Sequence, residues 1–454
     1  MITIKAGWVI CSWDQVIRDG VILIEDGKII DILTEKEYED PKWKMSPGGR
    51  RSEEGEILEK RNSIVFPGFV NAHMHQYGVL SHGIPQSGKV TDFRSFLTDY
   101  WWPAVENRVG RKETLITARA TMAEMIRSGI TAFCDTLEAP CTEEDTLLRQ
   151  GELIEKTGMR AVVSLESSQR ISDENGWRCL EMNRRAAEFF KKRKGPVRGA
   201  ICTHTTFTCS ENFIRRAAEM AAETGCLLQY HLSESRYEPD LLKRQTGDVP
   251  VRLYERAGAL GSHVIASQCV KVTREEMELL KETGTKTVHM PVSNCEVGGG
   301  IAPVPDMLEM GIHTALGTDG YVNDFFTVMK EAFLIHKAAR ESTDPMPARL
   351  VFRMATEYGA EAVGLEHAGR IENGADADLI IYENAHPTPV NEENIYDQIV
   401  VYGSSAHVTD VMAAGRWLMR DRQLVTLDEE ACMDEMRKCA EAFWQGAGVK
   451  GGAR

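Results

Sequence analysis

Two histidines one residue apart, His73 and His75, have the residue type and spacing to bind a metal ion. They follow an apolar run that starts at Ile64 and passes through Pro67-Gly68. Residues i and i+2 of a β-strand point to the same face, so the two imidazoles are expected to project together. Neutral imidazole nitrogens are common ligands of divalent metals. The pair therefore predicts part of a metal site, and the alternative is two exposed loop histidines.

Further polar residues stand where other apolar runs end. His204, His231 and His289 each end such a run, and Gln268 and Asp319 stand near the ends of two more. For any single one of them a structural explanation is available: a buried histidine is often a core residue, and Asp319 in a Gly-Thr-Asp-Gly segment suits a turn. Their repeated placement at strand ends favours a shared site.

A mononuclear metal site needs only four of these residues, His73, His75, His231 and Asp319. Three nitrogens and one carboxylate leave a position for water, and a divalent ion lowers the pKa of that water so that metal-bound hydroxide becomes the nucleophile. Proton transfer then requires a carboxylic acid nearby, and Glu234 follows His231 closely enough to supply it. We expect one divalent ion per chain, zinc first, while iron and manganese accept the same ligands.

Predicted strands bring these residues to one place. From residue 64 onward, strand candidates alternate with amphipathic helical segments. The strands expected are Ile64–His73, Ile130–Thr136, Ala161–Leu165, Arg198–His204, Cys226–His231, Val264–Cys269, Lys286–Met290 and Thr314–Asp319. This alternation predicts an α/β fold, a (β/α)8 barrel of the TIM type, with its active site at the carboxyl ends of the strands. A doubly wound open sheet is the alternative, but no Gly-x-Gly-x-x-Gly turn follows any predicted strand.

Both ends of the chain are predicted to be rich in β-strands. Residues 1–65 contain short alternating runs, two of them joined at Asp26-Gly27, which is typical of a hairpin. The strands expected after residue 365 are Gly369–Ile371, Asp378–Tyr382, Gln398–Val401, Val408–Ala413 and Arg416–Met419, followed by a helix over Glu429–Gln445. Neither end can bury a core alone, so we expect one small β-sandwich domain from 1–65 and 365–454, beside a barrel of residues 66–364.

Composition limits the classes of partner. The 454 residues carry a net charge of −15, and an acidic surface argues against nucleic acid or an anionic membrane. No apolar run approaches the roughly 20 residues of a membrane helix, and the first residues lack a signal peptide's features. The 11 cysteines form no Cys-x-x-Cys pair, which favours reduced thiols in a cytoplasmic protein. A homo-oligomer that acts on a small molecule is expected, because barrel surfaces commonly support assembly.

Five segments resemble the amidohydrolase superfamily. They are Pro67-Gly-Phe-Val-Asn-Ala-His-Met-His75, His204-Thr-Thr-Phe-Thr-Cys-Ser210, His231-Leu-Ser-Glu234, His289-Met-Pro-Val-Ser-Asn294 and Leu316-Gly-Thr-Asp-Gly320. They are most similar to its branch of triazine hydrolases, guanine deaminases and methylthioadenosine/S-adenosylhomocysteine deaminases. The likeness runs nearly end to end, because Gly374-Ala-Asp-Ala-Asp-Leu379 resembles that branch's return into its β domain.

The resemblance implies roles for individual residues, beginning with the same four metal ligands. Glu234 would protonate a ring nitrogen of the substrate, and Asp319 would take a proton from the water and pass it to the leaving amine. His204 matches a position that helps to hold the substrate. His289 matches a strand-7 histidine for which substrate binding, a structural part and a catalytic part all stay open.

At the end of strand 6 the sequence departs from the family pattern. The family has a His-Cys-Val segment there, whereas this chain has Ser267-Gln-Cys-Val270. The family's histidine contacts the attacking hydroxide, while Gln268 donates a hydrogen bond without carrying charge. We interpret Gln268 as a catalytic residue suited to a variant substrate, and the alternative is a weakened or lost activity.

The residues expected around the substrate differ as well. Nucleoside deaminases of this branch hold ribose with a carboxylate in a segment that matches Phe93–Leu97, where this chain has Arg94 and no acidic residue. Adenosine-type substrates are therefore disfavoured. Arg94, together with His82 where many relatives have arginine, suits an anionic group on a small substrate. The alternative for Arg94 is an exposed helix position.

These observations predict a metal-dependent hydrolase, most specifically a hydrolytic deaminase of an amino-substituted purine, pyrimidine, pterin or triazine ring. One alternative is hydrolysis of another bond, such as a ring amide, an N-alkyl group or a chloro substituent. A second alternative is a non-catalytic relative that binds a ligand, which the exchange at Gln268 would favour.

Overall fold

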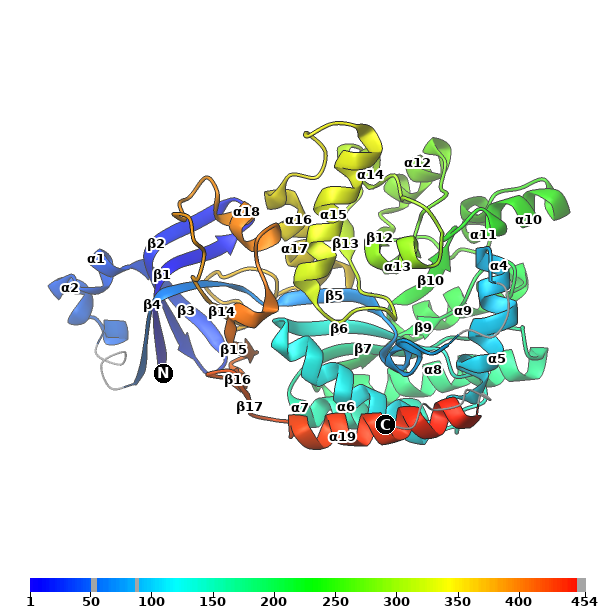
Figure 1. Ribbon diagram of the computed structural model, residues 1–454, viewed down its shortest axis with the longest axis horizontal. Coiled ribbons are helices and arrows are strands. Elements are labelled where there is room, and N and C mark those ends of the chain that lie inside the picture. The colour runs from blue at the N-terminus through cyan, green and yellow to red at the C-terminus, as the bar shows by residue number, and fades with distance from the viewer. Residues whose placement is uncertain (50–54, 86–89, 447–454) are drawn as a thin grey trace.

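Parallel strands form a closed barrel in the computed structural model, which describes residues 1–49, 55–85 and 90–446 (Figure 1). One parallel sheet contains β5 (Phe69–Met74), β6 (Ile130–Leu137), β7 (Arg160–Leu165) and β8 (Val197–Gly199). The other contains β9 (Ile201–Cys202), β10 (Leu228–Leu232), β11 (Val264–Gln268), β12 (Lys286–His289) and β13 (Thr314–Leu316). β8 and β9 share one strand position, separated by Ala200. Bridges from Met74 to Asp319 and from Ser167 to Thr203 close both seams, which confirms the predicted barrel.

The barrel strands are buried on both faces because helices cover the outside. Every residue of β6 is buried, from Ile130 to Leu137. The covering helices are α6 (Arg111–Arg127), α7 (Thr146–Thr157), α8 (Asp173–Arg193), α9 (Glu211–Thr224), α10 (Tyr237–Thr246), α11 (Pro250–Arg256), α12 (Arg274–Thr283), α13 (Pro291–Glu296), α14 (Val304–Glu309), α15 (Phe325–Arg340), α16 (Ala348–Ala355) and α17 (Glu357–Ala362). Thr273 and Glu276 form a capping box that starts α12.

A helical excursion after β5 lines the mouth of the barrel. It consists of η1 (Gln76–Ser81), α4 (Phe93–Ser95), the π-helical η2 (Phe96–Trp101), α5 (Trp102–Ala104) and η3 (Glu106–Arg108). Aromatic side chains hold it in place: Trp101 stacks on Phe96 and on Tyr321, which follows β13. The excursion therefore places aromatic rings directly over the carboxyl ends of the strands.

Both chain ends contribute strands to one eight-stranded sheet, as expected for the two β-rich ends (Figure 1). Its order is β17 (Gln423–Leu424), β16 (Arg416–Arg420), β15 (Val408–Ala413), β14 (Leu379–Glu383), β4 (Glu56–Pro67), β1 (Ile2–Ser12), β2 (Gln15–Glu25) and β3 (Lys28–Thr34). β4 lies at the centre, parallel to β1 and antiparallel to β14. The two halves share one apolar cluster that includes Ile4, Ile24, Leu379 and Met412.

Two of the predicted C-terminal strands are wrong. The segment predicted as strand Gln398–Val401 lies in helix α18 (Ile395–Val400), because the Asn391 side chain accepts from the backbone of Glu393 and Asn394 and starts a helical turn. Gly369–Ile371 forms no strand, although Ile371 N donates a backbone hydrogen bond to Cys11 O of β1.

The long strand predicted from Ile64 to His73 is divided at Gly68. Gly68 N donates to Asp378 O of the β domain, and a Cβ atom at this position would overlap Thr131 of β6. β4 therefore ends in one domain and β5 begins in the other. The predicted last helix is present as α19 (Glu429–Gly446), which packs on α6 and pairs Arg119 with Glu435 over 2.5 Å.

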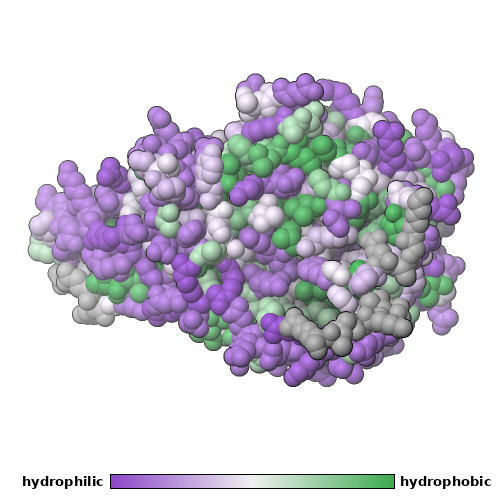
Figure 2. Space-filling view, in the orientation of Figure 1, coloured by the Kyte–Doolittle hydropathy of each residue, from purple (hydrophilic) through white to green (hydrophobic). Residues whose placement is uncertain are grey.

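Hydrophilic side chains cover most of the β domain in the view of Figure 2, while apolar side chains gather over the α15 side of the barrel. Leu334 of α15 is one of the large apolar residues exposed there. Among the described residues, no helix combines the length and apolar character needed to cross a membrane.

Candidate active site

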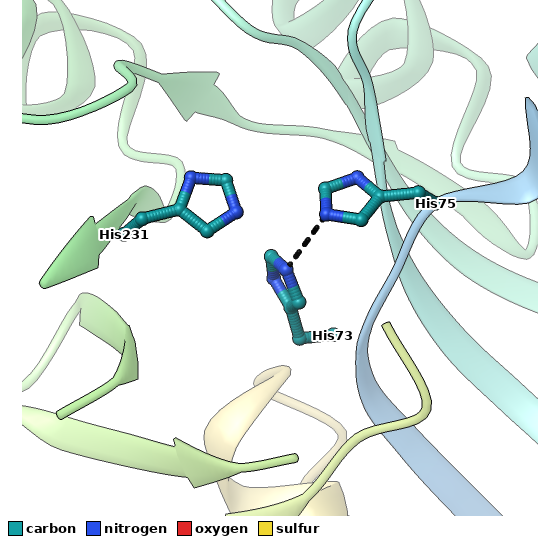
Figure 3. A group of neighbouring side chains, drawn as sticks. All are labelled: His73, His75 and His231. Atoms are coloured by element: carbon teal, nitrogen blue, oxygen red, sulfur yellow. Dashed lines mark hydrogen bonds between the residues drawn. The ribbon is translucent and has the colours of Figure 1, made fainter. Parts of the chain in front are cut away.

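Three predicted metal ligands converge at the mouth of the barrel (Figure 3). His73 lies in β5, His75 follows it, and His231 lies in β10. One ring nitrogen from each lies within 4.8 Å of the others, and all three side chains are buried. His73 Nε2 and His75 Nε2 are 3.3 Å apart, which confirms the expected common face. Asp319 completes the group, with Oδ1 at 3.0 Å from His75 Nε2.

The ring nitrogens turned away from this centre are held by hydrogen bonds. His73 Nδ1 lies 3.0 Å from Ser267 Oγ, and His75 Nδ1 donates to Thr136 O over 2.7 Å. Both Nε2 atoms therefore face inward, as ligating histidines do when their second nitrogen is fixed by a protein partner. His231 turns its Nε2 toward the other two rings (Figure 3), and in the described part of the chain its outward Nδ1 has no hydrogen-bond partner.

Electrostatics around the three histidines also fit a divalent cation. Burial, together with the neighbouring imidazoles, lowers the pKa of His73 well below its usual range, and burial lowers that of His231. Both are thus neutral, the form that binds metals. Burial would lower the pKa of His75 too, but Glu138 and Asp319 raise it well above normal. These two carboxylates attract positive charge to the same point, so the donor set fits a divalent metal.

Asp319 is oriented by a network that includes Gln268. Gln268 Nε2 and Ser293 Oγ each donate to Asp319 Oδ2 over 2.7 Å, and Gly320 N donates to Oδ1 over 2.9 Å. Asn294 in turn donates to Gln268 Oε1. Burial opposes ionisation of Asp319, but His75 and these donors hold its pKa below the usual range. The residue that replaces the family's histidine therefore positions an ionised carboxylate.

Glu234 lies in the same inner cavity, a space of 40 Å³ also lined by Gln268, Asp319 and His204. Burial raises the pKa of Glu234 well above its usual range, and the negative charges of Asp319 and Glu138 raise it further. The cavity therefore combines a protonated carboxylic acid with an ionised carboxylate, the pairing that proton transfer in two directions requires.

The predicted substrate-binding residues occupy three different places. His204 lines the inner cavity, and its Nδ1 lies 2.8 Å from Thr208 Oγ1. His82 and Arg94 line a larger outer cavity of 1260 Å³, where His82 Nε2 donates to Gly320 O over 2.8 Å. His289 lies outside both cavities, buried with its Nε2 at 3.1 Å from Nε2 of His336 on α15.

Sequence reasoning missed three buried acids near the histidines, two of which, Glu106 and Glu138, line the same cavity. Glu138 and Glu166 come directly after β6 and β7, and Glu106 comes from η3. Glu138 lies 3.9 Å from both His75 Nδ1 and His231 Nε2, and it accepts a hydrogen bond from Tyr77. The sequence contains a signal for two of them, since Glu138 and Glu166 follow strands just as the histidines do.

Comparison with known proteins identifies the family. The sequence profile described as the Amidohydrolase family matches residues 64–418. The chain belongs to the amidohydrolase family. The predicted resemblance and the predicted hydrolytic enzyme acting on C–N bonds are both confirmed, and His73 and His75 lie within the matched region of this amidohydrolase.

Relatives of this amidohydrolase cover nearly its whole length. A 5'-deoxyadenosine deaminase of Methanosarcina mazei is 31% identical over 434 residues, 94% of each chain. A 5-methylthioadenosine/S-adenosylhomocysteine deaminase of Dictyoglomus thermophilum is 31% identical over 432 residues, covering 93% of this chain and 97% of the relative. The solved structure of a Xanthomonas campestris adenosine deaminase with bound zinc superposes with a TM-score of 0.86 at 22% identity, over 98% of both chains.

Proposed function

We propose that this amidohydrolase is a hydrolytic deaminase of an amino-substituted nitrogen heterocycle of the purine, pyrimidine, pterin or triazine type. The observation that carries the proposal is the pairing of a protonated Glu234 with an ionised Asp319 beside three converging histidines. Deamination needs one acid to protonate the ring and one base to accept a proton from water. The deaminase names of relatives at 31% identity support the same reaction class.

His73, His75, His231 and Asp319 would hold one divalent ion. Zinc is our first choice because the similar solved adenosine deaminase contains it, and iron or manganese are the alternatives. Such an ion, when bound, lowers the pKa of water so that hydroxide is available near neutral pH. The inward-facing Nε2 atoms of His73 and His75 support this assignment.

Within this site Glu234 donates its proton to a ring nitrogen of the substrate, next to the carbon under attack. Asp319 accepts a proton from the attacking water and delivers it to the departing amino group. Gln268 and Ser293 keep the Asp319 carboxylate in place, because both donate to the same oxygen. A neutral amide at Gln268 adds no positive charge to the cavity, so burial and the negative charges of Asp319 and Glu138 keep the pKa of Glu234 well above its usual range.

The remaining predicted contacts are assigned by position. His204 orients the ring in the inner cavity, where Trp101 lies beside it. His82 and Arg94 receive the outer part of the substrate, including any anionic group, in the larger cavity. His289 supports the wall formed by β12 through its contact with His336, so its part is structural.

The protein is proposed to act in the cytoplasm as a homo-oligomer, with no nucleic-acid or membrane partner. All 11 cysteines are free thiols, which suits a reducing compartment. The net charge of −15 disfavours polyanionic partners.

Metal analysis combined with ammonia release tests the function. The purified protein should contain about one zinc per chain and release ammonia from one class in a panel of aminopurines, aminopyrimidines, pterins and triazines. Glu234→Gln should lower ammonia release by about 100-fold or more while retaining zinc. Chloride or alkylamine release without ammonia would replace the deaminase by a hydrolase of another bond, and a well-folded protein that binds no metal would overturn the site.

A further inference from the structure

The outer cavity is lined by cationic side chains that have no partner in the protein. We propose that Lys271, Arg236 and Arg244 form a subsite for an anionic group, a carboxylate or a phosphate, on an arm of the substrate that projects from the ring. This inference rests on the proposed function, because it takes the ring to lie in the inner cavity. It deepens that function by naming the charge of the substrate and the residues that select it.

The outer cavity has room for such an arm and adjoins the reaction centre. Its volume of 1260 Å³ is larger than the roughly 300–1,000 Å³ of a typical small-molecule site. The two cavities share the lining residues Phe93, Phe96, Trp101, Val297 and Tyr321. A substrate whose ring passes these side chains to reach the inner cavity therefore leaves its arm in the outer one.

Two of the cations come from loops that also carry residues of the reaction centre. Arg236 closely follows Glu234 in the chain, and Lys271 closely follows Gln268. Lys271 N donates to Ser233 O over 2.9 Å, which ties the two loops together. The position of the anionic arm is thus fixed relative to the acid that protonates the ring.

Glycines in the cavity wall make room for the Lys271 ammonium. Gly300 has a φ of +113°, and a Cβ atom at this position would overlap Lys271 Nζ. A Cβ atom on Gly299 would likewise overlap Glu234 O. Because glycine alone fits at both places, the loop that contains them holds the ammonium against the cavity and close to the Glu234 backbone.

The protein does not neutralise these cations. Within the described residues, Lys271, Arg236 and Arg244 form no ion pair and no side-chain hydrogen bond, although each lines the outer cavity. Arg256 of α11 shows the contrasting case, because it pairs with Glu211 of α9. The cavity therefore presents positive charge for which the protein supplies no counter-ion.

The acids that line the same cavity leave this charge available. Asp240 has the i, i+4 spacing to both Arg236 and Arg244 that favours ion pairs on a helix, yet it pairs with neither. Asp92 is engaged as the N-cap of α4, and Glu296 is an exposed residue at the end of α13. Both guanidinium groups are thus free to bind a ligand.

An anion between these side chains would relieve repulsion between like charges. Burial lowers the pKa of Lys271, and the positive charge of Arg236 lowers it further. The planar fork of an arginine matches a carboxylate or a phosphate, and a lysine adds a point charge. Since the chain as a whole carries a net charge of −15, this wall is a local exception on a surface that otherwise repels anions.

The carboxymethyl and carbamoylmethyl derivatives of adenine provide the test, because they share an aminopurine ring and differ in the charge of the arm. The phosphonomethyl derivative is a third probe, which separates phosphate from carboxylate. Binding to the zinc-loaded full-length protein is measured by ligand-observed NMR, which also reveals deamination. The better of the two anionic probes should bind about tenfold more tightly than the amide, since each exposed ion pair contributes up to about fivefold.

Variants and a metal-free sample identify the source of this preference. Lys271→Met and Arg236→Met should each reduce it by about threefold, and the double variant should bring it within about twofold of equal binding. Arg349→Met is the matched control, because Arg349 also lacks an ion pair but lies over Tyr396 in a different cavity. The preference should be unchanged in this control and should persist after zinc is removed, because the arm contacts protein cations.

Three results would overturn the subsite. These are equal or no binding of the anionic probes and the amide by the unaltered protein, a preference that survives in the double variant, and a preference that disappears with zinc. The unaltered protein decides the first and the third, so the test does not depend on the folding of a variant. Ammonia released equally fast from the acid and the amide would refute the subsite but keep the deaminase, whereas an anion preference without ammonia from any ring would refute only the deaminase.

Discussion

Replacing Gln268 with methionine is expected to weaken zinc binding by about 10- to 100-fold. Methionine keeps the length of the side chain but removes the donor that reaches Asp319 Oδ2 over 2.7 Å. A hydrogen bond to a charged group contributes about 1.5–3 kcal/mol. Since about 1.4 kcal/mol corresponds to tenfold in affinity, the lost bond alone accounts for this range. The cause is that Asp319 then loses one of the two donors that fix the oxygen.

Ser293→Ala removes the second donor to the same oxygen and should weaken zinc binding to a similar extent. The double variant should be weaker than either single one, because neither Gln268 nor Ser293 then donates to Asp319 Oδ2. Gln398→Met is the matched control: Gln398 is also buried and donates to Thr388 over 2.8 Å, far from the barrel mouth.

The zinc affinity of each variant is measured by competition with a chelator of known affinity, and circular dichroism verifies the fold. Gln398→Met should bind zinc as the unaltered protein does. Affinities of Gln268→Met and Ser293→Ala within about threefold of the unaltered protein would refute the reasoning, because a change below about 0.7 kcal/mol leaves no room for a charge-assisted bond. The backbone N–H of Gly320 would then be sufficient to orient the Asp319 carboxylate.

Three further outcomes are expected. Glu234→Gln should lower kcat/KM for ammonia release by about 100- to 10,000-fold with zinc content unchanged, and retention of a tenth of the activity would contradict its role as the acid. Because the pKa of Glu234 is raised, its reactive protonated form persists above the pH at which an ordinary glutamate ionises. The value of kcat/KM should therefore stay constant through that range and fall only when the pH exceeds the raised pKa. This fall at high pH should be absent from the pH profile of Glu234→Gln. Gly68→Ala should lower the free energy of unfolding in urea by about 1–3 kcal/mol, since the added Cβ overlaps Thr131. An unchanged urea midpoint would show that β6 shifts to accommodate the methyl group without loss of stability.

Local patterns were sufficient to predict the barrel and the histidine centre. The spacing of His73 and His75 determines a common face in any strand, so their convergence needed no three-dimensional information. Strands such as β6 are buried on both faces and therefore carry apolar or small side chains at most positions, as the run Ala132–Cys134 does. His231 was found because it ends such a run.

Other features depend on contacts that no local pattern contains. The apolar run at residues 399–401 suits a strand and a buried helix equally, and in the structure it follows a turn at Asn391 and lies at the end of α18. Gln268 was compared with the family's histidine by its chemistry, but its actual partners, Asp319 and Asn294, come from distant parts of the chain. The contact between Glu138 and Glu166 likewise joins residues from two neighbouring strands.

The central place of β4 in the β domain determines when that domain can be completed during synthesis. β4 leads through Gly68 into β5, which carries His73, and β4 pairs with β14 near the end of the chain. The ribosome must therefore add more than three hundred residues after His75 before β4 gains its last neighbour, as the separation between Ile64 and Tyr382 shows. Pairing across such a distance is slow. Completion of the β domain is thus a late event, and a chain that stops before Leu379 leaves an unpaired strand edge on β4, which leads directly into β5.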